Sequence, residues 1–346
     1  MKSAYFMGAD KDVKFEVKEE QIPEVKDNDV LIKVSACGIC GTDVHIYHGE
    51  EGSAPVNPPV VLGHEFSGVV EKIGSKVTKF KVGDHVCADP NMYCGSCRPC
   101  LNGKKQNCEH LYALGVNTNG GFEEYCLCPE NNLFKVGNNI DLDVACMAEP
   151  LACAIHGIDR AGIRMGDNVL VIGGGTIGLL MIQLAKNAGA AKVLLSEPVK
   201  MRRDIALSIG ADGAIDPINE DLNKRIYDYL GVDGADVVIE CVGNKGAVSQ
   251  AIGASCAGAT VLLFSVPKPH STVDLPLMDV YKKELTIKGS IINPDTHQRA
   301  VDMINNNRIE IKKLITHSYD LNHLEDAIKM QMSADSIKVI VKPWKI

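Results

Sequence analysis

The first part of the chain places short apolar runs between glycines and prolines. Residues 29–34 form an apolar run, residues 68–74 alternate between apolar and polar positions, and a Gly-Asp turn precedes an apolar pair within residues 81–86. Alternation with a period of two, broken by frequent turn residues, predicts short strands. We therefore expect residues 1–150 to form a small, irregular β-rich barrel.

From about residue 155 the pattern changes to apolar runs that alternate with amphipathic helical segments. An apolar run at 168–172 is followed by a helical segment at 179–188 and by a second run at 192–196. This alternation indicates an α/β domain with a doubly wound parallel sheet, which we expect to span residues 151–289. Its later elements are predicted as strands at 213–216, 235–240, 260–264 and 285–288 and a helix at 245–257.

The last segment, residues 290–346, does not continue the strict alternation. It predicts a helix at 295–306, a short strand, a second helix at 321–332 and a final strand at 338–342. We infer that this segment returns to the first domain.

Composition and charge narrow the class of protein. The 346 residues are 45% hydrophobic and 23% charged, with a net charge of −8 and a pI of about 5.7. This acidic balance argues against a nucleic acid or an anionic membrane as partner. No apolar stretch is long enough to span a bilayer, and no signal-peptide pattern opens the chain, so we expect a cytoplasmic protein. An odd number of cysteines, 13, indicates thiols and metal ligands rather than disulfides.

A glycine-rich loop follows the strand predicted at 168–172 and precedes a helix. In this G-x-G-x-x-G pattern, Gly173 permits a tight turn, Gly175 allows close approach of a pyrophosphate, and Gly178 allows a helix to pack on the strand. Glu197 follows about twenty residues later, where a carboxylate binds the adenosine ribose and disfavours a 2′-phosphate. The loop therefore predicts NAD rather than NADP, although Lys200, Arg202 and Arg203 lie nearby. The expected cofactor residues are Gly173, Gly175, Thr176, Ile177, Gly178, Glu197 and Arg202.

Four cysteines lie close together between residues 94 and 108, separated by glycine, proline and lysine. Their number matches a closed, tetrahedral, all-cysteine zinc site, which stabilises a fold and leaves no position open for chemistry. Alone, such a quartet also fits a zinc ribbon in a nucleic-acid-binding protein, against which the acidic charge argues. The predicted structural zinc ligands are Cys94, Cys97, Cys100 and Cys108.

A second candidate metal site begins at residues 37–45, which offer thiol, hydroxyl, carboxylate and imidazole groups. His64 and Glu65 follow, and Glu149 comes much later. Three protein ligands from a thiolate, an imidazole and a carboxylate leave the fourth position of a zinc ion open, as in catalytic sites. Cys37 is expected to be a buried thiol. Cys153, one helical turn after Glu149, remains an alternative third ligand.

Together, the segments 40–45 and 63–65, the cysteine quartet, Glu149-Pro150 and the glycine-rich loop resemble the zinc-containing medium-chain alcohol dehydrogenases. Within that family the chain is most similar to the polyol, sorbitol-type branch, with threonine and butanediol dehydrogenases close behind. The resemblance covers essentially the whole chain. It implies a GroES-like catalytic domain, a Rossmann domain, and a homodimer or homotetramer.

The resemblance also implies roles for individual residues. Cys40, His64 and Glu149 would hold the catalytic zinc, with Glu65 beside it as a ligand in some members or stages. Thr42 would touch the substrate oxygen, His45 would end a proton relay to solvent, and Asp43 would orient His64. The chemistry expected is hydride transfer from an alcohol to NAD, with zinc as Lewis acid.

The substrate is expected to be a small polyol or another secondary alcohol, with threonine or 2,3-butanediol as alternatives. Sorbitol-type enzymes carry an Arg-Tyr pair after the last Rossmann strand, whereas residues 291–294 here read Ile-Ile-Asn-Pro. This difference argues against sorbitol itself as the substrate. A zinc-free, quinone-reductase-like relative is a further alternative, against which the presence of Cys40, His64 and Glu149 argues.

Overall fold

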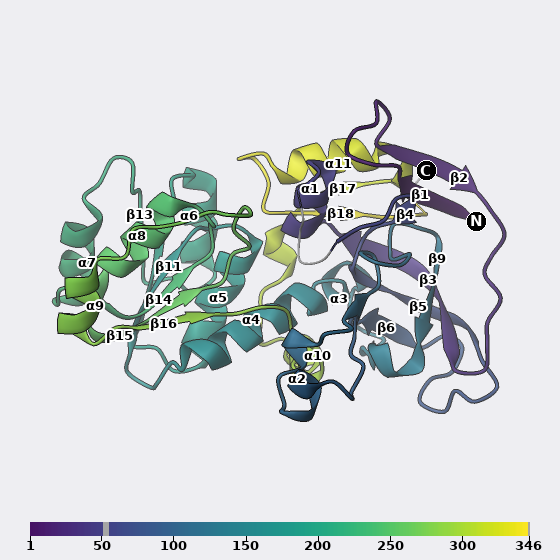
Figure 1. Ribbon diagram of the computed structural model, residues 1–346, viewed down its shortest axis with the longest axis horizontal. Helices are drawn as coiled ribbons and strands as arrows, with labels where there is room; N and C mark the ends of the chain where they lie inside the picture. Colours follow the sequence, from purple (N-terminus) through teal and green to yellow (C-terminus); the bar gives the residue numbers. More distant parts are fainter. Residues whose placement is uncertain (51–54, 345–346) are drawn as a thin grey trace. The chain divides into compact units, whose positions relative to one another are not determined.

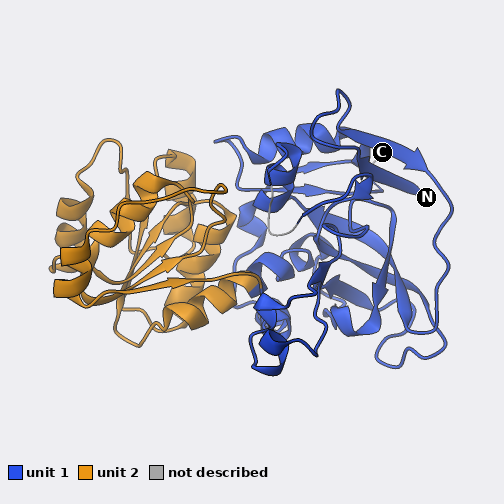
Figure 2. Ribbon diagram, viewed as in Figure 1, with its two compact units in different colours: residues 1–152, 293–346 blue, residues 153–292 orange. Residues whose placement is uncertain are grey.

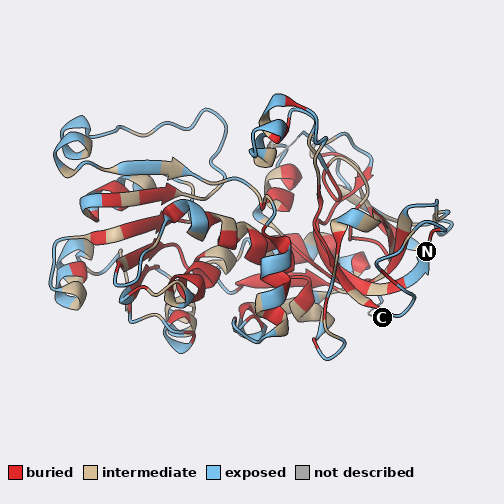
Figure 3. Ribbon diagram, turned by 90° about the horizontal axis from the view of Figure 1, so that it is seen from below, coloured by how far each residue is buried: buried red, intermediate tan, exposed pale blue. Residues whose placement is uncertain are grey.

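The computed structural model describes residues 1–50 and 55–344. The chain divides into two compact units: Met1–Ala152 with Asn293–Ile346, and Cys153–Ile292 (Figure 2). In both units the central strands are largely buried, whereas edge strands and several helices carry exposed residues (Figure 3). Across the residues that are described, no helix combines the length and apolar character needed to cross a membrane.

The second unit is built on a six-stranded sheet in the order β13-β12-β11-β14-β15-β16, with all neighbours parallel (Figure 1). This order reverses direction between β11 and β14, which is the Rossmann arrangement, and it confirms the expected α/β fold class. The strands are β11 (Asn168–Ile172), β12 (Lys192–Ser196), β13 (Gly213–Ile215), β14 (Ala235–Glu240), β15 (Ser255–Leu263) and β16 (Thr286–Gly289). The helices are α5 (Thr176–Asn187), α6 (Lys200–Ser208), α7 (Leu222–Leu230), α8 (Lys245–Gly253) and α9 (Leu277–Lys283).

Side chains alternate between the two faces of this sheet, as the strand period requires. Leu170, Leu194 and Val238 share one buried cluster with Ile226 of α7 and Ala251 of α8. Apolar groups on both faces of the central strands explain why the sequence shows continuous runs here rather than alternation.

The first unit is organised around the long strand β3 (Asp29–Gly38). It pairs antiparallel with β5 (Glu65–Ile73), with β9 (Tyr125–Pro129) and, at its end, with the last strand of the chain, β18 (Lys338–Val341). The seven-stranded sheet has the order β10-β6-β5-β3-β18-β17, with β9 on β3. Its other strands are β6 (His85–Ala88), β10 (Leu133–Lys135) and β17 (Ile315–Tyr319).

Smaller elements complete the first unit. A three-stranded sheet, β2-β1-β4, consists of β1 (Lys2–Phe6), β2 (Phe15–Glu19) and β4 (Val60–Val61), and β7 (Asn91–Met92) pairs with β8 (Tyr112–Ala113). The helices are α1 (Gly41–Tyr47), α2 (Arg98–Leu101), α3 (Leu142–Ala145), α10 (His297–Asn305) and α11 (Leu324–Gln331), and α4 (Ala148–Ala161) begins here.

Three predicted helices are longer than those observed. The helix expected at 245–257 ends at Gly253, because Ala254 accepts a backbone hydrogen bond from Ala235 and the chain enters β15. The helix expected at 295–306 begins at His297, after Asp295 with its positive φ of 57°. At 321–332 the α-helix starts only at Leu324, after a 3₁₀ turn.

Candidate active site

Two strands of the first unit bring the mixed metal ligands together. Gly38 at the end of β3 lies opposite Glu65 at the start of β5 in the antiparallel register. Cys40 precedes α1, and its backbone N–H donates to Asp43 Oδ2 at 2.8 Å. Ligand atoms of Cys40, His64 and Glu65 all lie within 4.8 Å of one another.

These groups suit a zinc ion chemically. His64 and Asp43 are buried, with 7% and 0% exposure, and His64 Nδ1 lies 3.7 Å from Asp43 Oδ1. Among the described side chains, both atoms lack a hydrogen-bond partner. Burial alone lowers the pKa of His64, but the charges of Asp43, Cys40 and Glu149 raise it well above its ordinary value. A cation bound by thiolate, imidazole and carboxylate would balance this negative charge.

Lys338 is a further member of the site that the sequence did not single out. It begins β18, pairs with Glu65, and donates from Nζ to the carbonyl of Ile39 at 2.8 Å. Burial alone lowers the pKa of Lys338, but the charges of Glu65 and Cys40 raise it. Gly38 leaves room for the pair, because a Cβ there would lie 3.0 Å from Lys338 Cε. The only signal in the sequence is a lysine at the edge of an apolar strand.

Glu149 lies in the first turn of α4 and is buried. Its charge acts on His64, so it belongs to the same neighbourhood, but it is outside the group formed by Cys40, His64 and Glu65. Cys153, one turn further along α4, is also outside that group. The choice of third ligand remains a prediction. Cys37, expected to be a buried thiol, is 0% exposed.

Helix α1 carries the hydroxyl and the second imidazole of the motif. Thr42 is buried with 6% exposure, while His45 is partly exposed. Residues three positions apart lie on the same side of a helix, so these two side chains are neighbours along one face of α1. His45 Nδ1 lies 2.6 Å from Glu50 Oε2.

The four quartet cysteines form a second ligand group, with all four sulfurs within 4.8 Å of one another. Backbone N–H groups of Ser96 and Cys97 donate to Cys94 Sγ at 3.5 and 3.3 Å, and they lower the pKa of Cys94 to about 6. N–H donors of this kind stabilise the thiolate that zinc requires. The group has the ligand number of a closed structural site, as the spacing predicted.

The glycine-rich loop joins β11 to α5. Gly173 has a φ of +97°, which other residues rarely adopt, and a Cβ on Gly178 would overlap the Gly173 carbonyl. Gly175 caps α5, and no atom lies within 4 Å of where its Cβ would be. The start of this helix therefore has open space beside Gly175, as a pyrophosphate site requires.

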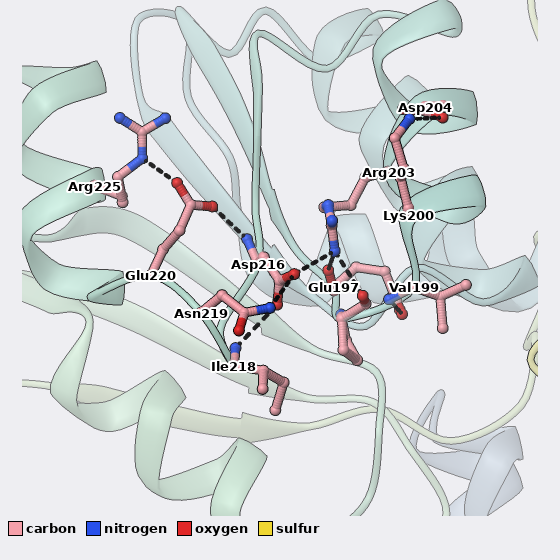
Figure 4. A network of polar contacts seen from close by, with 11 residues as sticks. Glu197, Val199, Lys200, Arg203, Asp204, Asp216, Ile218, Asn219, Glu220 and Arg225 are labelled. Carbon is pink, nitrogen blue, oxygen red and sulfur yellow. Dashed lines mark hydrogen bonds and ion pairs between the residues drawn. The ribbon is translucent and has the colours of Figure 1, made fainter.

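Glu197 follows β12 and lies beside this loop. Its carboxylate is buried and accepts from the Gly174 N–H at 2.6 Å and from the Val199 N–H at 2.8 Å. Arg203 points away from the carboxylate: it donates to the carbonyl of Glu197 and pairs with Asp216 at 3.2 Å (Figure 4). Arg202 lies next to Gly174, with its Cβ 3.3 Å from the position of a Cβ there. The predicted cofactor residues thus converge on one loop.

In the segment that replaces the Arg-Tyr pair, the polar residue Asn293 is committed to internal contacts. Asn293 is 0% exposed, and its side chain accepts from Asn91 Nδ2 at 2.6 Å. His297, also buried, lies 3.3 Å from the Asn293 amide. Asn293 therefore does not offer a free amide to a substrate.

A Rossmann sheet with a nucleotide loop, combined with a Cys-His-Glu group and a cysteine quartet, defines a zinc-dependent dehydrogenase. Comparison with known families agrees: "Alcohol dehydrogenase GroES-like domain" matches residues 26–138, and "Zinc-binding dehydrogenase" matches residues 176–306. The chain belongs to the zinc-binding medium-chain alcohol dehydrogenase family. It is an enzyme of the zinc-dependent, NAD(P)-linked alcohol dehydrogenase type.

The identities to individual relatives do not decide between the threonine dehydrogenase branch and the polyol dehydrogenase branch. The chain is 36% identical to an L-threonine 3-dehydrogenase of Bacillus licheniformis, over 93% of each chain. It is also 36% identical to a probable D-xylulose reductase A of Neosartorya fischeri, over 95% of this chain and 93% of that one. Among solved structures, a putative zinc-binding dehydrogenase of Sinorhizobium meliloti bound to NADP is 38% identical, with a TM-score of 0.93 and 99% of each chain covered.

Proposed function

We propose that this enzyme oxidises a secondary hydroxyl of a polyol, or of a similar vicinal diol, with NAD, and reduces the ketone in reverse. The observation that supports this most is the carboxylate of Glu65 grouped with Cys40 and His64. A carboxylate in place of a second thiolate makes the metal a harder acid, which favours substrates rich in oxygen. A neighbouring hydroxyl on the substrate gives such a site a second oxygen to hold.

Four residues of the first unit are proposed to hold and orient the zinc site. Cys40, His64 and a carboxylate from Glu65 or Glu149 hold the zinc, and Asp43 fixes the orientation of His64. When bound, zinc acidifies the substrate hydroxyl and the nicotinamide accepts the hydride.

Thr42 and His45 lead the hydroxyl proton away along one side of α1. The overall reaction converts the alcohol and NAD⁺ to the ketone, NADH and one proton. NAD would supply the hydride acceptor, and the residues of the chain would carry the remaining proton to solvent.

Glu197 supports NAD as the preferred cofactor. Its buried carboxylate stands at the end of β12, where it can accept hydrogen bonds from ribose hydroxyls and repel a 2′-phosphate. Arg203 is engaged with Asp216 rather than directed at that position. The NADP in the Sinorhizobium meliloti structure belongs to that protein.

L-Threonine is a second candidate substrate, because an L-threonine 3-dehydrogenase is as similar to this chain as a D-xylulose reductase is. Threonine, like a diol, carries a second polar group on the carbon next to the oxidised one. From the family resemblance we also infer a cytoplasmic location and a homodimer or homotetramer. Light scattering would measure the oligomeric state.

Metal content and a substrate panel test the proposal together. Zinc per chain is measured by plasma mass spectrometry, and NAD reduction is followed near pH 8 with xylitol, sorbitol, 2,3-butanediol and L-threonine. We expect two zinc ions, turnover with at least one polyol, and one zinc without turnover in Cys40→Ala. One zinc in the wild-type protein, or full activity in Cys40→Ala, would show that the proposed site is wrong. Turnover of threonine alone would select the second candidate.

A further inference from the structure

The end of α1 folds back on itself in a way that pairs His45 with a carboxylate. The helix ends at Tyr47, and Gly49 adopts a left-handed conformation with a φ of +75°. This turn lets the N–H of Glu50 donate to the carbonyl of His45 at 2.9 Å. As a result, Glu50 Oε2 lies 2.6 Å from His45 Nδ1. The side chains are 21% and 25% exposed, so the pair lies at the edge of solvent.

We propose that Glu50 is a positioning residue that also takes up the proton from His45 during alcohol oxidation. This inference rests on the proposed function. The substrate hydroxyl loses one proton, which reaches His45 by way of Thr42 and is gained at Nε2. The Nδ1 proton is then passed to the Glu50 carboxylate, which releases it to water. No electrons move in this relay, because the electron pair leaves with the hydride.

The bond to Nδ1 determines what the other ring nitrogen can do. In a neutral imidazole one nitrogen donates and the other accepts, and a carboxylate at Nδ1 holds the hydrogen there. Nε2 is thereby the acceptor at the start of a turnover. After the relay the ring releases the Nε2 proton to water and regains a proton at Nδ1 beside Glu50, which restores this state.

The other charged groups around α1 are engaged elsewhere. Asp43 is buried beside His64. On another side of the helix, Lys14 and Glu325 contact Tyr47, Glu325 pairs with Lys329 of α11, and His48 contacts Met332. Within residues 1–50 and 55–344, Glu50 is thus the carboxylate that the structure places against the His45 ring.

Two variants of Glu50 and one matched control test the relay. Glu50→Ala removes the acceptor, and Glu50→Gln keeps a hydrogen-bond acceptor but cannot take up a proton. Glu325→Gln is the control. The Glu325 carboxylate, on α11, accepts a hydrogen bond from the Tyr47 hydroxyl of α1 at 2.9 Å and does not contact His45. Nitrogen-15 NMR of the histidine rings, assigned with His45→Gln, gives the tautomer of His45 in the enzyme without substrate. Turnover is measured with the alcohol found in the substrate panel.

In the wild-type enzyme we expect His45 to carry its hydrogen on Nδ1, and in Glu50→Ala to shift toward the Nε2-protonated form. We expect kcat to fall about tenfold or more in both Glu50 variants, and formate to restore part of it in Glu50→Ala. Glu325→Gln should stay within about twofold of the wild type. An unchanged tautomer in Glu50→Ala, or unchanged kcat in both Glu50 variants, would overturn the inference while the proposed function stands. Absence of turnover with every alcohol would overturn both.

Discussion

Replacing Lys338 by methionine should strongly destabilise the first unit. Lys338 and Glu65 form an ion pair whose side chains are only 3% and 2% exposed, and Lys338 also donates to the Ile39 carbonyl at 2.8 Å. Methionine keeps most of the stem but leaves a buried carboxylate and a buried carbonyl without the cation. Removing one partner of a buried ion pair costs about 3–5 kcal/mol. We expect the free energy of unfolding to fall by that amount.

The single tryptophan allows the free energy of unfolding of the first unit to be measured. The ring centroids of Trp344 and Tyr125 of β9 are 5.4 Å apart, and Lys33 Nζ of β3 lies 4.3 Å from the Trp344 ring centroid. The fluorescence of Trp344 therefore follows unfolding of this sheet. Urea titrations are run with a chelator, so that zinc affinity does not contribute to the difference. The double variant Lys338→Met with Glu65→Gln has no unpaired charge and should recover more than half of the loss. A loss below about 1 kcal/mol, as for a solvent-exposed pair, would refute the reasoning.

Two further predictions concern other acidic groups. Burial raises the pKa of Asp89 from 3.8 to about 6, so the folded state holds this proton more tightly than the unfolded chain. Wild-type stability, relative to Asp89→Asn, should therefore increase by about 2 kcal/mol as the pH falls from 6 to 4, and equal pH dependence in the two proteins would contradict this. Glu197→Ala should lower the NAD:NADP ratio of kcat/KM at least about tenfold, because hydrogen bonds to a charged acceptor are lost. Steady-state rates with both cofactors measure it, Glu220→Ala is the control, and an unchanged ratio in Glu197→Ala would show that this carboxylate does not select the cofactor.

The Rossmann strands could be predicted closely because their signal is local. Strands β11 and β12 have the bounds expected from their apolar runs, since buried parallel strands end where glycines and charged residues begin. The helix α8 was predicted too long because Ala254 and the residues after it suit either a helix or a strand. Only the pairing of Ser255 with Ala235 decides between them, and that contact is not visible in the local pattern.

The grouping of the candidate metal ligands was predictable for a different reason. The cysteine quartet lies within a short segment, so its spacing alone brings the sulfurs together. Cys40, His64 and Glu65 required the register of β3 with β5, which the resemblance supplied and the sequence pattern did not. Lys338 is far from all of them in sequence, and only the pairing of β18 with β3 places it against Glu65. Glu50 depends on one turn after α1, which the pattern did not indicate.

The charges in the first unit explain why a cation belongs there. Asp43, Glu65 and Glu149 are at most 6% exposed, and Cys40 adds a thiol that must be deprotonated to bind metal. Lys338 balances one carboxylate. The charges of Asp43, Cys40 and Glu149 raise the pKa of His64, so the groups that would surround a cation also favour positive charge on this ring. Zinc requires the neutral imidazole and the thiolate, so binding must release protons while leaving the buried charge balanced. Metal binding is therefore an exchange of protons for a cation, in a core whose buried acids favour positive charge.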